Sequence, residues 1–194
     1  MIVLASTSIT RQALLSNAGI PVTTAKPDVD EQKLIVENPT WSPADTSLNL
    51  ARAKAIDVSS RSMEAVVVGA DQVLSFRNRI YSKPADMAAA RNQLNELRGH
   101  THELISSAAC VRNGVEIWNT TARARLKMRH FSDEFLENYL QSNGRNCMTS
   151  VGGYQIEGLG SQLFESIEGD HFTILGLPLF PLMQFLRSAG ELQS

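Results

Sequence analysis

A single carboxylate follows a run of three valines in this chain, and a lysine comes shortly after it. The valines of residues 66–68 predict a buried strand, and Asp71 is expected at its carboxyl end. In open α/β sheets, ligands and catalytic groups gather at that end of the strands. An aspartate there, with Lys83 following it, suits a metal-bound phosphate. An aspartate that merely ends a strand and caps a turn would give the same pattern.

Three polar residues lie where a first strand passes into a first helix. Ser6, Ser8 and Arg11 follow the apolar residues 2–5. The amino terminus of a helix offers unpaired N–H groups and a positive dipole end, which suit phosphate. Serine hydroxyls add donors, and an arginine fork binds two phosphate oxygens. The alternative is that Ser8 only caps the helix and that Arg11 is a surface residue.

An acidic cluster at residues 28–31 ends in Glu31. Such clusters are usually solvated, but carboxylate oxygens are the ligands that Mg²⁺ prefers, and a phosphate site needs only one or two of them. Glu31 and Asp71 could supply these from separate segments. Lys54 and Lys83 are single cations, and each taken alone is better explained as a surface lysine.

The remaining candidate groups carry little chemistry by themselves. The glycine-rich residues 152–158 contain one carboxylate, Glu157, but match neither a P-loop nor a dinucleotide fingerprint. The four histidines share no spacing and are expected to be structural.

Helices and strands must position these groups, and several have clear local signals. Ser42, Pro43 and Asp45 form a capping box with proline at the first helical position. Asn113-Gly114 between apolar runs predicts a tight hairpin. Further helices are expected at residues 9–18 and 86–97, after Ser132 and after Pro178, and strands at residues 2–5 and 122–129. This mixture of hairpins and helices predicts an α/β fold with a mixed sheet.

Composition restricts the class of protein. The 194 residues are 43% hydrophobic and 20% charged, which is typical of one globular domain, or of two fused lobes. A net charge of −2 disfavours a nucleic-acid-binding protein. The basic stripe of the strand at residues 122–129 has no interleaved aromatic residues and is interpreted as a solvated face. No apolar run reaches the length of a membrane span, and the two cysteines fit a reducing cytoplasm.

Taken in order, these segments resemble the Maf family of nucleoside triphosphate pyrophosphatases. The resemblance covers nearly the whole chain and implies one domain over residues 1–194, an elongated mixed sheet flanked by helices, and two lobes with a central cleft. The matching segments are Leu4-Ala5-Ser6-Thr7-Ser8 with Arg11, Asp30-Glu31, Ala51-Arg52-Ala53-Lys54-Ala55, Gly69-Ala70-Asp71, Lys83-Pro84, Gly152-Gly153-Tyr154 through Gly158, and Gly176-Leu177-Pro178-Leu179.

The resemblance also implies roles for residues. Asp71 matches the family's catalytic acidic position, with Glu31 as a second metal ligand for Mg²⁺ or Mn²⁺. The phosphate-binding set would be Ser6, Ser8, Arg11, Lys54 and Lys83. The implied reaction is house-cleaning hydrolysis of a nucleoside triphosphate to the monophosphate and pyrophosphate, in the cytoplasm, by a protein that could form a homodimer.

One position differs from the family's usual first-helix motif and two differ from members that resemble dTTP and UTP hydrolases, and together they look like the branch associated with 7-methyl-GTP. These are Thr10, Gln72 and Glu157, which would set the choice of base. A carboxylate at Glu157 could accept hydrogen bonds from the N1–H and N2–H edge of guanine, and methylation at N7 strengthens such bonds. The alternatives are hydrolysis of dTTP and UTP, hydrolysis of inosine or xanthosine triphosphate, and a nucleotide-binding regulator of cell division with negligible turnover.

Overall fold

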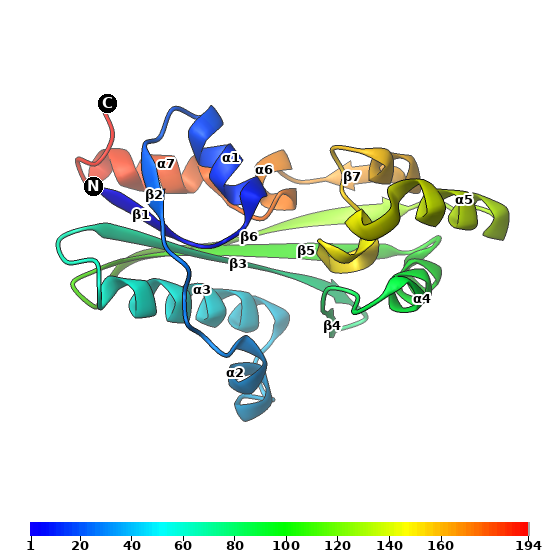
Figure 1. Ribbon diagram of the computed structural model, residues 1–194, viewed down its shortest axis with the longest axis horizontal. Helices are drawn as coiled ribbons and strands as arrows, with labels where there is room; N and C mark the ends of the chain where they lie inside the picture. Colours follow the sequence, from blue (N-terminus) through cyan, green and yellow to red (C-terminus); the bar gives the residue numbers. More distant parts are fainter. Residues whose placement is uncertain (194) are drawn as a thin grey trace. The chain divides into compact units, whose positions relative to one another are not determined.

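The computed structural model describes residues 1–193, and in that part of the chain seven strands form one mixed sheet in the order β2-β1-β3-β5-β6-β7, with β4 on β3 (Figure 1). The strands are β1 (Ile2–Ala5), β2 (Val22–Thr24), β3 (Val66–Phe76), β4 (Arg79–Tyr81), β5 (Thr101–Arg112), β6 (Val115–Met128) and β7 (Phe164–Glu168). The helices are α1 (Ile9–Asn17), α2 (Glu31–Glu37), α3 (Pro43–Ser59), α4 (Met87–Leu97), α5 (Asp133–Asn143), α6 (His171–Ile174) and α7 (Leu179–Ser188). Short 3₁₀ helices are η1 (Gly144–Met148), η2 (Val151–Gly153) and η3 (Leu159–Leu163).

Pairing directions confirm the prediction of a mixed sheet flanked by helices. β1 runs parallel to both β2 and β3, whereas β3–β4 and β6–β7 are antiparallel. The predicted hairpin joins β5 to β6, where Asn113 and Gly114 have φ of 51° and 77°. Positive φ at both central residues is what a type I′ turn requires.

The chain divides into two compact units, and each is described separately. The first unit comprises residues 1–72, 105–123 and 170–194, and the second comprises residues 73–104 and 124–169. The long strands β3, β5 and β6 contribute residues to both.

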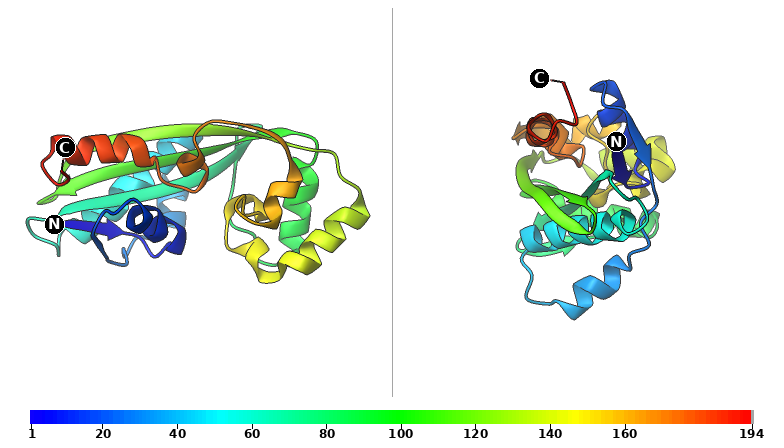
Figure 2. Two further views of the ribbon diagram at one scale, coloured as in Figure 1. Left: turned by 90° about the horizontal axis from the view of Figure 1, so that it is seen from above. Right: turned by 90° about the vertical axis from the view of Figure 1, so that its left-hand side faces the viewer.

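In the first unit, helices cover both faces of the sheet. Side chains of α1 and α7, such as Leu15 and Leu182, pack with β1 and β3 in one apolar cluster. Ala55 and Val58 of α3 pack with the alternate residues of the same strands in a second cluster. Figure 2 shows α7 and α3 on opposite faces of the strands when the molecule is viewed from its end. This double cover explains why residues 66–68 are apolar without alternation.

The second unit contains α4, α5, the 3₁₀ helices, β4 and β7. Its core includes a buried aromatic group in which the Tyr154 ring contacts His102 and Phe164. The Nε2 atom of His102 lies 2.6 Å from the Tyr154 hydroxyl, and burial lowers the pKa of His102 to about 4. His102 is therefore a neutral core residue, as expected for a structural histidine.

Local signals predicted the helix starts well. Ser42 Oγ accepts a hydrogen bond from the Asp45 amide and Asp45 accepts one from the Ser42 amide, so the capping box is confirmed. Ser8 and Ser132 are likewise N-caps of α1 and α5. None of the helices within residues 1–193 is long and apolar enough to cross a membrane.

The structure corrects the expected position of Asp71. The valine strand does not end there, because β3 continues to Phe76 and Asp71 lies in its middle. Its parallel partner β1 stops at Ala5, opposite Gly69. Asp71 therefore lies just beyond the carboxyl end of the parallel ladder, although not at the end of its own strand.

Candidate active site

Arg11, in the first turn of α1, forms hydrogen bonds with other segments of the first unit, next to the serines that follow β1. Ser6 is buried, and its Oγ accepts a hydrogen bond from the Ser8 amide at 3.1 Å. Arg11 Nε donates to the carbonyl of Gly176 at 2.8 Å, and its Nη1 donates to the carbonyl of Ala70 at 2.9 Å. Ser8 is a helix cap, as one alternative predicted, but Arg11 is half-buried and bridges the segments of the first unit rather than projecting from the surface.

A glycine brings α3 close to β3. A Cβ atom on Gly69 would lie 2.1 Å from the carbonyl oxygen of Ala51 and 2.9 Å from the Cβ of Ala55. Because these neighbours are mostly backbone, only glycine allows this approach. Lys54 lies on the same buried face of α3. The close contact at Gly69 therefore delivers Lys54 to the part of β3 that carries Asp71.

Lys54, Asp71 and Glu31 form a three-residue charge cluster. Lys54 Nζ lies 2.6 Å from Asp71 Oδ1 and 2.9 Å from Glu31 Oε1. The side chains of Lys54 and Asp71 are each 8% exposed, whereas that of Glu31 is 49% exposed. A charge buried to this extent is costly unless it is paired. The cluster thus pairs a buried cation with two carboxylates, one of which reaches solvent.

The charges perturb one another. Burial raises the pKa of Asp71, and the positive charges of Lys54 and Arg11 act in the opposite direction. Desolvation lowers the pKa of Arg11, which the carboxylates of Asp71 and Glu31 oppose. Arg11 therefore lies within electrostatic range of the cluster. Perturbed pKa values in buried, charged groups are common at functional sites.

The positions expected to set base choice differ in their surroundings. Gln72 follows Asp71, and its Nε2 donates to Ser106 Oγ and to the carbonyls of Thr173 and Ile174 at 2.9–3.0 Å. These bonds fix the side-chain amide against other parts of the first unit. Thr10 is half-buried in the first turn of α1.

Lys83 and Glu157 belong to the second unit. Lys83 is exposed and follows β4, and Glu157 is exposed in the turn before η3. The preceding helix η2 contains Gly152 and Gly153, both with positive φ, and the Tyr139 hydroxyl donates to the carbonyl of Gly153 at 3.1 Å. The residues expected to bind the substrate are thus divided between the units.

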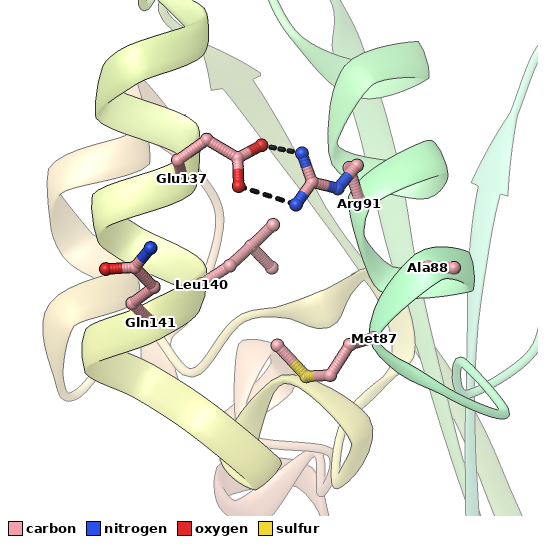
Figure 3. A pocket seen from close by; sticks show the side chains of 6 residues that line it. All are labelled: Met87, Ala88, Arg91, Glu137, Leu140 and Gln141. Carbon is pink, nitrogen blue, oxygen red and sulfur yellow. Dashed lines mark hydrogen bonds and ion pairs between the residues drawn. The ribbon is translucent and has the colours of Figure 1, made fainter.

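Two hollows in the second unit lack a catalytic arrangement. The first, of about 310 Å³, lies between α4 and α5 (Figure 3). Its charged residues Arg91 and Glu137 form an ion pair with each other, so neither charge is left for a ligand. The second hollow, of about 270 Å³, is lined by polar residues that include Arg77 and Arg125.

The basic stripe of residues 123–129 was interpreted as a solvated face, and Arg123 and Arg125 are exposed while several of its side chains bond within the protein. Arg125 pairs with Glu168, Lys127 donates to the carbonyl of Gly99, and Arg129 donates to that of Gln162. Arg123 also has an interaction partner.

Sequence reasoning missed two residues that support the cluster. Ser47 of α3 is fully buried, and its Oγ donates to the carbonyls of Asp71 and Ile105 at 3.0 and 3.2 Å. Gly69 belongs to the Gly69-Ala70-Asp71 motif, which by itself does not indicate a helix contact. The signal for Ser47 was its position seven residues before Lys54, which is the same face of a helix.

Metal-binding groups are few. Among residues 1–193, no group of three or more histidine, cysteine, aspartate or glutamate side chains could hold a metal ion. Asp71 and Glu31 nevertheless direct one oxygen each at a single cation, which here is the ammonium of Lys54. A pair of carboxylates completed by water and substrate oxygens is a common arrangement for Mg²⁺, so these residues fit such an ion.

Comparison with known proteins places this geometry in context. The sequence profile described as "Maf-like protein" matches residues 1–189. A "nucleoside triphosphate pyrophosphatase" from Paramagnetospirillum magneticum is 50% identical over 97% of this chain and 98% of its own length. A "7-methyl-GTP pyrophosphatase" from Rhizobium meliloti is 44% identical over 100% and 98%. A solved structure of a HAM1 protein from Coxiella burnetii matches with a TM-score of 0.42 and 16% identity, over 66% of this chain and 72% of that one.

Proposed function

Since this chain belongs to the Maf-like protein family, we propose that it is a nucleoside triphosphate pyrophosphatase that favours 7-methyl-GTP. The reaction would cleave the α–β phosphoanhydride and release the nucleoside monophosphate and pyrophosphate. Relatives named for each of the two activities match nearly the whole chain. We also take residues 1–194 as a single functional domain.

The observation that carries this proposal is the charge cluster around Lys54. Asp71 and Glu31 meet at one cation, and Arg11 lies close enough to influence Asp71 electrostatically. Hydrolysis of a triphosphate needs both positive charges for the phosphates and carboxylates for a divalent cation. The first unit contains both kinds of group in one cluster.

Each residue has a role in this proposal. A divalent cation, Mg²⁺ or Mn²⁺, held by Asp71 and Glu31 would supply charge neutralisation and help to activate water. Asp71 would accept a proton from the attacking water, because it is the most buried carboxylate of the cluster. Lys54, Arg11 and Lys83 would bind the phosphate oxygens and stabilise charge that develops on the leaving pyrophosphate.

The hydroxyls at the start of α1 would add donors to the phosphate site. Ser6 and Ser8 lie beside the exposed amino terminus of that helix. Their present bonds to the Ser8 and Arg11 amides use the hydroxyl oxygens as acceptors, so the hydroxyl protons stay available as donors.

Base choice would depend on Thr10, Gln72 and Glu157. Guanine offers two adjacent N–H donors at N1 and N2, whereas thymine and uracil offer one N–H between two carbonyls. The exposed carboxylate of Glu157 matches the guanine edge. The positive charge that methylation adds at N7 would strengthen those hydrogen bonds.

A nucleotide panel tests the proposal. Pyrophosphate release is measured from 7-methyl-GTP, GTP, dTTP, UTP and ITP, with Mg²⁺ or Mn²⁺ and again with EDTA. We expect 7-methyl-GTP to give the highest kcat/KM, and EDTA to abolish release. Preference for dTTP or UTP would retain the chemistry but overturn the roles of Gln72 and Glu157. Absence of turnover with every nucleotide would favour a binding protein over an enzyme.

A further inference from the structure

We propose that Lys54 is the resident cation of the metal-free site, and that a divalent cation enters by exchange with its ammonium group. The inference rests on the proposed function, which assigns Asp71 and Glu31 to the metal. It adds that the ammonium of Lys54 leaves the two carboxylates when the divalent cation binds to them.

The geometry places the ammonium where the two carboxylates converge. Asp71 comes from β3, Glu31 from the first residue of α2, and Lys54 from α3. Lys54 Nζ lies 2.6 Å from Asp71 Oδ1 and 2.9 Å from Glu31 Oε1. An ion that approaches these two oxygens must therefore compete with the ammonium for them.

The balance of charges also favours exchange of the ammonium for the divalent cation. The cluster contains the carboxylates of Asp71 and Glu31 and the ammonium of Lys54, and the nearby Arg11 adds a second positive charge, so the four charges balance. A doubly charged ion added beside both cations would meet strong repulsion in a poorly solvated site. Removal of the ammonium from the carboxylates relieves that repulsion.

Lys54 is the charged group of the site with the fewest bonds to the backbone. The backbone of Asp71 is held within a strand, and its carbonyl accepts a hydrogen bond from Ser47 at 3.0 Å. Arg11 is bound to two backbone carbonyls. The ammonium of Lys54, in contrast, stands on a flexible four-carbon stem and bonds only to side chains.

Exchange would link the ion to the nucleotide. An ammonium released from the carboxylates lacks a partner until a polyanion supplies one. A bound triphosphate would stabilise the released form of Lys54, and so would favour ion binding. By thermodynamic reciprocity, the ion would favour nucleotide binding by the same factor.

A rival arrangement has to be separated from exchange. The ion could bind the other carboxylate oxygens, Asp71 Oδ2 and Glu31 Oε2, while Lys54 keeps its place. In both arrangements, loss of a positive charge near the site strengthens ion binding to some degree. The state of Lys54 itself therefore has to be observed in the unmodified protein.

Nuclear magnetic resonance of the lysine side chains provides that observation. The chain has only five lysines, so ¹³C- and ¹⁵N-labelled lysine gives few signals, and loss of one signal in Lys54→Gln assigns it. On titration with Mg²⁺ and no nucleotide, we expect the Lys54 Cε and Nζ signals to shift to those of an unpaired ammonium. The exposed Lys33 serves as the internal reference. A Lys54 signal that stays unchanged while calorimetry records ion binding would overturn the inference.

Ion affinity gives a second readout. We expect Lys54→Gln to bind Mn²⁺ about tenfold more tightly than the unmodified protein, since charge-assisted bonds no longer compete. Lys33→Gln removes a charge two residues from Glu31 but leaves the ammonium of Lys54 in place, and we expect less than about twofold change. If Lys54→Gln and the unmodified protein bind Mn²⁺ equally tightly and pyrophosphate release is sensitive to EDTA, the exchange of Lys54 is overturned. The assignment of the metal to Asp71 and Glu31 would then stand. Absence of ion binding in both, with release that resists EDTA, would overturn the metal assignment as well.

Discussion

The two units hold their charged candidate residues in opposite ways. In the first unit, Lys54 and Asp71 are buried and bonded to each other, and Arg11 is bonded to backbone carbonyls. In the second unit, Lys83 and Glu157 are exposed, and neither forms a hydrogen bond or ion pair with any residue of 1–193. Burial forces charges to be paired and fixed in position, whereas exposed charges stay free to meet a ligand.

This difference suggests a division of labour. A fixed, desolvated cluster suits chemistry that is common to all nucleoside triphosphates, because electrostatic stabilisation is strongest where charges are preorganised and water is excluded. An exposed glutamate after a glycine turn suits discrimination among bases, because it tolerates substitution without harm to the fold. Substitutions of the buried Lys54 and Asp71 should therefore change turnover of every nucleotide, and substitution of the exposed Glu157 should change the order of preference.

The largest effect is expected for Asp71→Asn. Loss of this charge removes one of the two carboxylates that hold the cation and the group proposed to accept the proton. We expect kcat to fall by about 10³-fold or more for all nucleotides, with an unchanged circular dichroism spectrum. Asp133→Asn, at a side chain that is 86% exposed, is the matched control and should keep full turnover. An active Asp71→Asn enzyme would contradict the assignment.

The next effect concerns stability of the second unit at low pH. The pKa of His102 falls from its ordinary 6.5 to about 4 on folding, so the unfolded chain binds the extra proton between these values. Stability from this group is complete above pH 6.5 and declines as the pH falls towards 4, by about 3 kcal/mol in total. Chemical denaturation across this range measures the slope.

Two variants test whether His102 causes the dependence of unfolding free energy on pH. His102→Gln keeps a neutral polar group beside Tyr154 and should remove this part of the pH dependence. His171→Gln, at an exposed histidine, should leave it in place. An identical slope in the unmodified protein and in His102→Gln would show that His102 is not the responsible group.

A smaller effect on stability is expected for Gly69→Ala. The new Cβ would overlap the carbonyl oxygen of Ala51, so α3 must move away from β3 and carry Lys54 away from Asp71. We expect a loss of about 2 kcal/mol in unfolding free energy, together with reduced turnover. Gly158→Ala, where the nearest atom lies 4.0 Å away, should leave the unfolding free energy unchanged. Equal stability of the two variants would argue against a tight α3–β3 contact.

The smallest effect is expected for Glu157→Gln. The side chain is exposed, so unfolding free energy should change by less than about 0.5 kcal/mol. The ratio of kcat/KM for 7-methyl-GTP to that for dTTP should fall about tenfold, because an amide replaces the charged acceptor for guanine. An unaltered ratio would remove Glu157 from base choice and weaken the division of labour.

The sequence was most informative where structure depends on neighbours along the chain. The capping box at Ser42 and Asp45 and the turn at Asn113-Gly114 involve residues within three positions of each other, and both were predicted correctly. α2 was not predicted, because it buries no residue and so has no apolar face to recognise.

The sequence predicted which residues belong to the candidate site, but it did not predict the hydrogen bonds that hold them. The motifs named Arg11, Lys54 and Asp71, yet the strand end expected at Asp71 was wrong, since β3 continues through pairing with β4. The bonds of Gln72 join it to Thr173 and Ile174, about a hundred positions away. Such contacts depend on how the strands assemble, which local patterns do not encode. The single domain, the roles of the site residues and a homodimer stay predictions.

Identification of the products tests the central claim most directly. The protein is incubated with 7-methyl-GTP and Mg²⁺, and the nucleotide and phosphate products are quantified by anion-exchange chromatography. The account predicts equal amounts of the nucleoside monophosphate and pyrophosphate, with neither formed by Asp71→Asn. Formation of the diphosphate and inorganic phosphate, or of no product by the folded protein, would contradict it.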